Sequence, residues 1–108
     1  MVEKNKIRNT WVSNPSSTGT QYSIACVVSA TLGNENKIYN NLVSDIQFSG
    51  TIYGLYFTTT NYLKAYHNTI SLDHTTATGT TTTYGIYSSS TSAVGIDFQN
   101  NNISITRG

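Results

Sequence analysis

The segment IYNNLVS, residues 38–44, recurs in close copies along a chain of 108 residues. The copies begin at residues 7, 38, 65 and 98 and read IRNTWVS, IYNNLVS, AYHNTIS and FQNNNIS. A second block alternates with the first and reads YSIAC at 22–26, YGLYF at 53–57 and YGIYS at 84–88. An internal period near 30 residues indicates that one structural unit is written several times.

Both blocks have the composition of short β-strands, because they are rich in Tyr, Ile, Val and Phe and are bounded by Asn, Gly, Ser and Thr. We therefore predict an all-β fold, a right-handed parallel β-helix (solenoid) of about three to four coils. Residues 1–108 would form a single segment of a longer array, with the repeats in about residues 5–106. Segments 53–57 and 84–88 should pair in parallel.

Stacking the coils would align equivalent apolar residues into ladders that share one core. One predicted ladder is Ile24, Leu55 and Ile86. The others are Val12, Val43, Ile70 and Ile103, and Ile7, Ile38, Ala65 and Phe98.

Asparagine recurs between the two strand-like halves of the first block. The first column is Asn9, Asn40, His67 and Asn100, and the second is Thr10, Asn41, Asn68 and Asn101. Asparagine tolerates the left-handed backbone of a tight corner, and its amide can hydrogen-bond to a copy stacked above it. We predict a structural ladder at this corner, with His67 standing in for an asparagine.

These columns resemble the asparagine ladders of right-handed parallel β-helix proteins of the pectate-lyase-like superfamily. The stretches NTISLDHTTATGTTTTYGIYSSS and IDFQNNNISITRG are also similar to repeats of secreted Bacteroidota surface proteins. The resemblance covers nearly the whole chain and implies an extracellular or cell-surface location. It does not select an activity, because this fold hosts lyases, hydrolases, adhesins and stalks.

Composition excludes several classes of partner. Charged residues make up 10% of the chain and the net charge is +1, so no electrostatic footprint for nucleic acid is present. No run of residues approaches the roughly 18 apolar residues of a membrane span, so we expect no membrane insertion. The start, MVEKNKIRNTWV, lacks a signal-peptide core, so the chain is cytoplasmic or its signal lies outside this sequence.

No catalytic or metal site is predicted, and no cofactor. Glycoside hydrolysis needs converging carboxylates, whereas Asp45 and Asp97 fall in columns that are not acidic. Asp73 and His74 are read as a polar loop entrance ahead of the threonine tract 75–83, which could alternatively carry glycans or order water. Cys26 shares strand parity with Ile24 and is read as a small buried hydrophobe rather than a reactive thiol.

Two tyrosines are the candidate ligand-binding residues. If Leu55 and Ile86 point inward, Tyr56 and Tyr87 point outward and stack one coil apart. Such rings would form a platform for a sugar, or they would only stack on each other and cover strand backbone.

The sequence thus favours a structural or adhesive β-helix segment of a secreted bacterial surface protein. The alternative is part of a carbohydrate-active β-helix protein, either a polysaccharide lyase or hydrolase or a non-catalytic polysaccharide-binding module. The expected partners are polysaccharide or cell-surface components. We also expect end-to-end self-association, because no atypical polar repeat closes either end of the array.

Overall fold

The computed structural model describes residues 1–74 and 81–106, which form eleven β-strands in three sheets. Sheet 1 contains β1 (Val2–Glu3), β4 (Asn36–Tyr39), β7 (Leu63–Tyr66) and β10 (Ile96–Gln99). Sheet 2 contains β2 (Lys6–Ile7), β5 (Leu42–Val43), β8 (Thr69–Leu72) and β11 (Asn102–Ile105). Sheet 3 contains β3 (Thr20–Cys26), β6 (Thr51–Phe57) and β9 (Thr83–Ser88).

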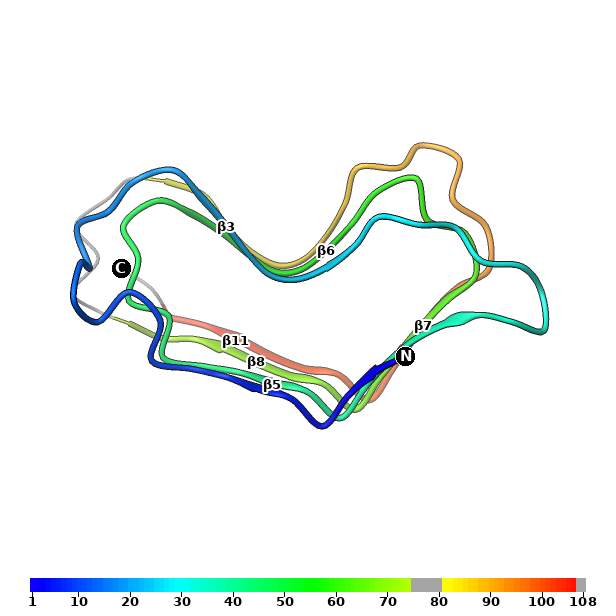
Figure 1. Ribbon diagram of the computed structural model, residues 1–108, viewed down its shortest axis with the longest axis horizontal. Coiled ribbons are helices and arrows are strands. Elements are labelled where there is room, and N and C mark those ends of the chain that lie inside the picture. The colour runs from blue at the N-terminus through cyan, green and yellow to red at the C-terminus, as the bar shows by residue number, and fades with distance from the viewer. Residues whose placement is uncertain (75–80, 107–108) are drawn as a thin grey trace.

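The chain visits sheets 1, 2 and 3 in fixed rotation, and each such pass is called a circuit below (Figure 1). Every pair of neighbouring strands within the three sheets is parallel, as between β4 and β7 and between β6 and β9. The predicted parallel pairing of 53–57 with 84–88 is confirmed, with Leu55 opposite Ile86. The three sheets remain separate, and their order is compatible with a parallel β-helix.

The core lies between the sheets and is densest in the two central circuits. Val43, Ile52, Leu63 and Ala65 have no exposed surface, and they come from all three sheets. Ile103 continues the column of Val43 and Ile70 in the last circuit but remains 41% exposed, since no further described strand covers it. Each circuit is therefore buried mainly by its neighbours rather than by its own side chains.

The predicted alignment of the first circuit is wrong by five residues. Val2, not Ile7, pairs with Ile38, and Ile7 pairs with Val43 in the place predicted for Val12. Val12 lies outside the core and is 52% exposed. Both alignments put apolar side chains five residues apart into the two inward columns, so hydrophobic pattern alone does not distinguish them. The two alignments are distinguished by the side-chain amide at the corner between sheets 1 and 2. In the first circuit this amide belongs to Asn5.

The corner between sheets 1 and 2 carries one left-handed residue in every circuit. Lys4, Asn40, His67 and Asn100 have φ values of 57°, 55°, 56° and 52°. The predicted first column is therefore corrected in its first member, where Lys4 replaces Asn9. Asn40, His67 and Asn100 are exposed, and within the described residues their side chains make no hydrogen bond. Their role is to supply the backbone conformation of the corner.

The following residue forms a continuous ladder of side-chain amides, here called the asparagine ladder: Asn5, Asn41, Asn68 and Asn101. Asn68 Oδ1 accepts hydrogen bonds from the backbone nitrogen and Nδ2 of Asn41 at 3.1 and 2.9 Å. Asn101 Oδ1 accepts the same pair of bonds from Asn68 at 3.0 and 2.9 Å. Asn5 donates likewise to Asn41, so Asn5 replaces Thr10 as the first rung.

Each amide also donates to a backbone carbonyl, so its hydrogen-bonding capacity is largely used. Nδ2 of Asn41, Asn68 and Asn101 donates to the carbonyl oxygens of Val2, Ile38 and Ala65 respectively, at 3.1, 2.9 and 2.7 Å. Asn41 and Asn68 are buried, and a buried amide needs such partners to offset its desolvation. The asparagine ladder consequently holds sheets 1 and 2 in register at their shared corner.

Candidate functional site

Sheet 3 bends toward the interior in the middle of its strands. In β6, Ile52, Gly54, Leu55 and Phe57 are buried, so two consecutive residues face inward. The regular pairing of β6 with β9 continues on both sides of Gly54 but does not include it. Figure 1 shows β3 and β6 curving toward the strands of sheet 2 at this point.

Glycine permits the bend because the opposite sheet leaves no room for a side chain. A Cβ added to Gly54 would lie 2.6 Å from Cγ2 of Ile70 in β8 and 2.6 Å from the carbonyl oxygen of Gly85. A Cβ on Gly85 would lie 2.4 Å from Cγ2 of Ile103 in β11. Glycine inside a strand often marks such a close approach of backbone to its neighbours.

The break in alternation places five tyrosines on the outer face of sheet 3. Tyr53 and Tyr56 are three residues apart, and in a regular strand they would point to opposite faces. Here their ring centroids lie 5.3 Å apart. Together with their equivalents in the neighbouring strands, they form what is called the tyrosine surface below: Tyr22, Tyr53, Tyr56, Tyr84 and Tyr87.

The tyrosine surface consists of two stacked columns that touch edge to face. Tyr22, Tyr53 and Tyr84 stack with centroid separations of 5.1 and 4.8 Å and interplanar angles of 9° and 5°. Tyr56 and Tyr87 stack at 5.9 Å and 6°. The contact of Tyr53 with Tyr87 across the columns is T-shaped, at 5.1 Å. Both geometries are favourable for aromatic pairs.

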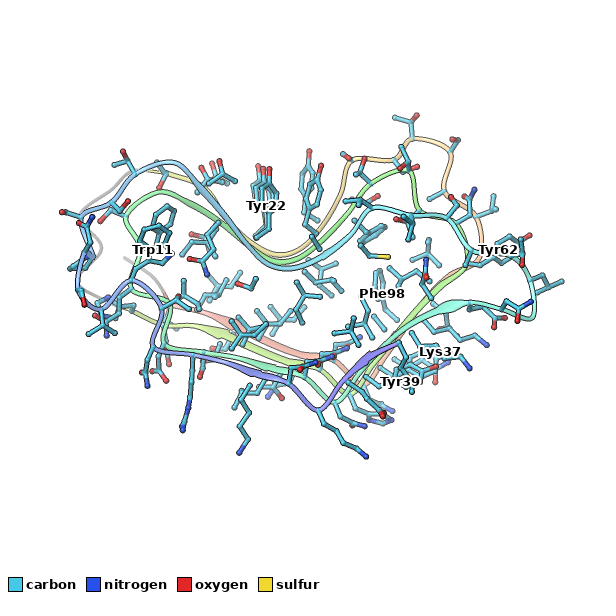
Figure 2. All side chains as sticks on the ribbon, viewed as in Figure 1. Trp11, Tyr22, Lys37, Tyr39, Tyr62 and Phe98 are labelled. Atoms are coloured by element: carbon cyan, nitrogen blue, oxygen red, sulfur yellow. The ribbon has the colours of Figure 1, made fainter. Side chains whose placement is uncertain are left out.

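Tyr22 is the most exposed ring of the tyrosine surface, and the other four are half-buried. Figure 2 shows Tyr22 projecting outward from the bend, on the side of the molecule opposite Tyr39. Tyr22 is 49% exposed. The pKa of the Tyr53 hydroxyl is raised above its ordinary value, first by desolvation and then by the neighbouring tyrosines. The Tyr53 phenol therefore stays protonated at neutral pH, so its hydroxyl can both donate and accept hydrogen bonds.

A polar cavity of about 310 Å³, called the hydroxyl cavity below, adjoins the tyrosine surface. Its walls are the loops that follow β6 and β9, and its lining is Thr58, Thr59, Asn61 and residues 89–92. The hydroxyl of Tyr56 lies 3.4 Å from Oγ of Ser89, which lines the cavity. The two features are therefore continuous.

The described segments on this side of the molecule carry no formal charge. Segments 20–34, 46–63 and 81–96, which contain sheet 3 and the lining of the hydroxyl cavity, include no Asp, Glu, Lys, Arg or His. The charged residues of the described chain instead lie in or beside the strands of sheets 1 and 2. On sheet 1, Lys64 pairs with Glu35 at 3.4 Å, and the Tyr66 hydroxyl donates to the Asp97 carboxylate.

Sequence reasoning singled out Tyr56 and Tyr87, which do lie side by side, but it missed Tyr22, Tyr53 and Tyr84 on the same face. A strictly alternating strand puts Tyr53 and Leu55 on one face, which would direct Tyr53 inward. The signal that predicts the bend is the glycine inside each of the blocks YGLYF and YGIYS.

The other candidate residues are dispersed. Asp73 accepts a hydrogen bond from Ser71 at 3.1 Å, and Cys26 is a half-buried free thiol. Within residues 1–74 and 81–106, no group of three or more His, Cys, Asp and Glu side chains is arranged to hold a metal ion. The same part of the chain contains no helix of the length and hydropathy that a membrane crossing requires. Most of the threonine tract, residues 75–80, lies outside the described residues, as does Arg107.

No protein-family model, curated protein or solved structure matches this chain significantly. The features of this chain that suggest a function are therefore the tyrosine surface and its surroundings.

Proposed function

We propose that this chain is a segment of right-handed parallel β-helix that acts without catalysis, as a structural and adhesive part of a secreted surface protein. The chain adheres by binding polysaccharide at the tyrosine surface. The observation that carries this proposal is the row of five stacked tyrosines on one uncharged face, from which Tyr22 projects outward.

The chemistry of these side chains matches that of a sugar. A tyrosine offers an apolar ring to the C–H groups of a pyranose and a hydroxyl that donates and accepts hydrogen bonds. In the stacks, the face of each inner ring is covered by its neighbour. The ring edges and the hydroxyl groups are therefore the parts that a ligand can contact. Tyr22 lies on the edge strand β3 and has a ring neighbour in its own column on one side only, which leaves its other face open.

The scaffold makes this surface rigid before any ligand arrives. Each tyrosine contacts at least two others in the surface, and strand pairing fixes their spacing. A preorganised aromatic surface loses little side-chain entropy on binding, which increases affinity. A stalk built of such circuits would repeat the same binding surface along its length.

The experiment is affinity electrophoresis of the chain in gels that contain single soluble polysaccharides. Replacing Tyr22 and Tyr87 together by alanine should weaken retention about tenfold, since each aromatic contact is worth about 0.5–1.5 kcal/mol. The matched control is Tyr39→Ala with Tyr66→Ala, because that pair stacks at 5.1 Å and 11° on the opposite side of the molecule. Equal retention of the two double variants, both folded by circular dichroism, would refute the proposal.

A further inference from the structure

The polar groups that line the hydroxyl cavity fall into two sets. One wall is fixed internally: Asn61 Oδ1 accepts the backbone N–H of Val94 at 3.0 Å, and the Thr59 hydroxyl donates to the carbonyl of Val27 at 3.4 Å. In the other wall, the hydroxyls of Ser90 and Thr91 have no hydrogen-bond partner among the described residues. These hydroxyls are available to a ligand.

Hydroxyl side chains suit a ligand that is itself a polyol. Every Ser and Thr hydroxyl can donate one hydrogen bond and accept two, as every sugar hydroxyl can. The volume of about 310 Å³ is at the lower end of the range for small-molecule sites, which suits one monosaccharide unit rather than an extended chain.

The lack of charge selects among sugars. No ionisable side chain other than tyrosine and Cys26 occurs in segments 20–34, 46–63 and 81–96. A uronate or sulfated sugar placed here would lose hydration without gaining a cationic partner, which costs binding free energy. A neutral sugar loses only hydroxyl hydration, and the cavity hydroxyls replace it.

The position of the cavity relates it to the tyrosine surface. The contact at 3.4 Å between the Tyr56 hydroxyl and Ser89 Oγ joins the aromatic rings to the cavity rim. A polysaccharide that lies on the tyrosine rings and extends past Tyr56 would therefore place its next sugar unit at the cavity.

We infer that the hydroxyl cavity is a subsite for one neutral sugar unit, a branch or terminal residue of a neutral polysaccharide whose main chain lies on the tyrosine surface. This inference rests on the proposed function and adds to it a substrate class and a second set of contacts.

The test uses the whole chain and three probes: a galactomannan, a β-glucan and polygalacturonate. The variant Ser90→Ala with Thr91→Val removes two cavity hydroxyls at nearly constant volume. Ser104→Ala with Thr106→Val is the matched control, because both residues are exposed at the far side of the molecule in or beside β11. Dissociation constants are measured by isothermal titration calorimetry.

We expect wild type and control to bind at least one neutral probe at least tenfold more tightly than polygalacturonate. The cavity variant should lose about tenfold in that affinity, as expected for two hydrogen bonds of about 0.5–1.5 kcal/mol each.

Unchanged neutral binding in the cavity variant would overturn the subsite while leaving the tyrosine surface as the binding site. Polygalacturonate binding equal to neutral binding would overturn the substrate class. If no probe binds the wild-type chain, both this inference and the proposed function fail.

Discussion

At the scale of single residues, Gly54 determines whether sheet 3 can bend. Gly54→Ala should destabilise the fold by roughly 1–3 kcal/mol, because the new methyl group overlaps Cγ2 of Ile70 and the carbonyl oxygen of Gly85. Urea unfolding followed by circular dichroism measures the change. Ser104→Ala, at an exposed position in β11, is the control and should stay within about 0.5 kcal/mol of wild type. An unchanged midpoint for Gly54→Ala would show that the sheets have room to separate.

Ser23 is the equivalent position in the first circuit, and its hydroxyl is buried without a hydrogen-bond partner among the residues that the structure describes. Ser23→Ala should therefore stabilise the chain by about 1 kcal/mol, since it removes a desolvated polar group and leaves a Cβ that already fits. The same unfolding assay measures it. A lower stability than wild type would indicate that the hydroxyl is paired in solution.

The asparagine ladder allows a matched pair of substitutions. Asn68→Leu should cost roughly 1–3 kcal/mol, because Asn68 is 3% exposed and its amide bonds to both neighbouring rungs. Asn102→Leu is the control, as Asn102 is exposed in β11 and pairs with Thr69. Asn61 is a poorer control because its side chain accepts a bond from Val94. Equal melting temperatures for the two variants would count against a stabilising ladder.

At the scale of elements, sheet 1 should show a specific dependence on alkaline pH. The hydrogen bond to Asp97 is the largest cause that raises the pKa of Tyr66 from its ordinary value of 10.0 to about 12. A pKa raised in the folded state means that the protonated phenol stabilises folding below pH 10.0, and that this contribution is lost as the pH rises toward 12.

The stability of wild type should therefore decline more steeply than that of Tyr66→Phe between these pH values. Urea midpoints measured at successive pH values give the comparison, with Tyr39→Phe as the control from the same stack. Parallel pH profiles for wild type and Tyr66→Phe would show that the hydrogen bond has no energetic role.

The repeat period and the residue types predicted the strands, their parallel pairing and most of the corner between sheets 1 and 2. They did so because every coil buries equivalent residues against its neighbours. The first circuit was misaligned because IRNTWVS resembles the repeat, while Lys4-Asn5 lacks the doubled asparagine found at 40–41 and 100–101. Two of the five residues of the tyrosine surface were predicted. Strand alternation found Tyr56, but the bend at Gly54 depends on contact with Ile70 in another sheet, which a strand pattern does not contain.

At the scale of the whole molecule, the two ends of the stack are complementary. In each bond between two rungs of the ladder, the N–H donor lies in the earlier circuit and the Oδ1 acceptor in the later one. The Asn101 backbone N–H therefore has no acceptor within the described chain, and Asn5 Oδ1 accepts no bond there. Phe98, Ile103 and Ile105 are 39–42% exposed at the same end. A second copy placed head to tail would extend all three sheets and add a rung to the ladder.

We therefore expect light scattering of the purified chain to show mass that rises with concentration. Ile103→Lys should reduce this association, because it places a charge on the exposed end of the core. Glu3→Lys changes the opposite end of the stack. It tests whether two copies associate head to tail, since a head-to-tail contact requires both ends. A stable monomer at high micromolar concentration, with cooperative melting, would show that the ends are adequately closed.

The parallel rings of the tyrosine surface also have an optical consequence. Chromophores stacked about 5 Å apart share their electronic excitation, so the near-ultraviolet circular dichroism should carry the signature of coupled phenols rather than of separate ones. The single tryptophan, Trp11, bonds through Nε1 to Gln21, the neighbour of Tyr22 at one end of the column. Excitation energy absorbed by a tyrosine of the column can be transferred to Trp11. The fluorescence of Trp11 then reports, without any added label, whether the column is intact.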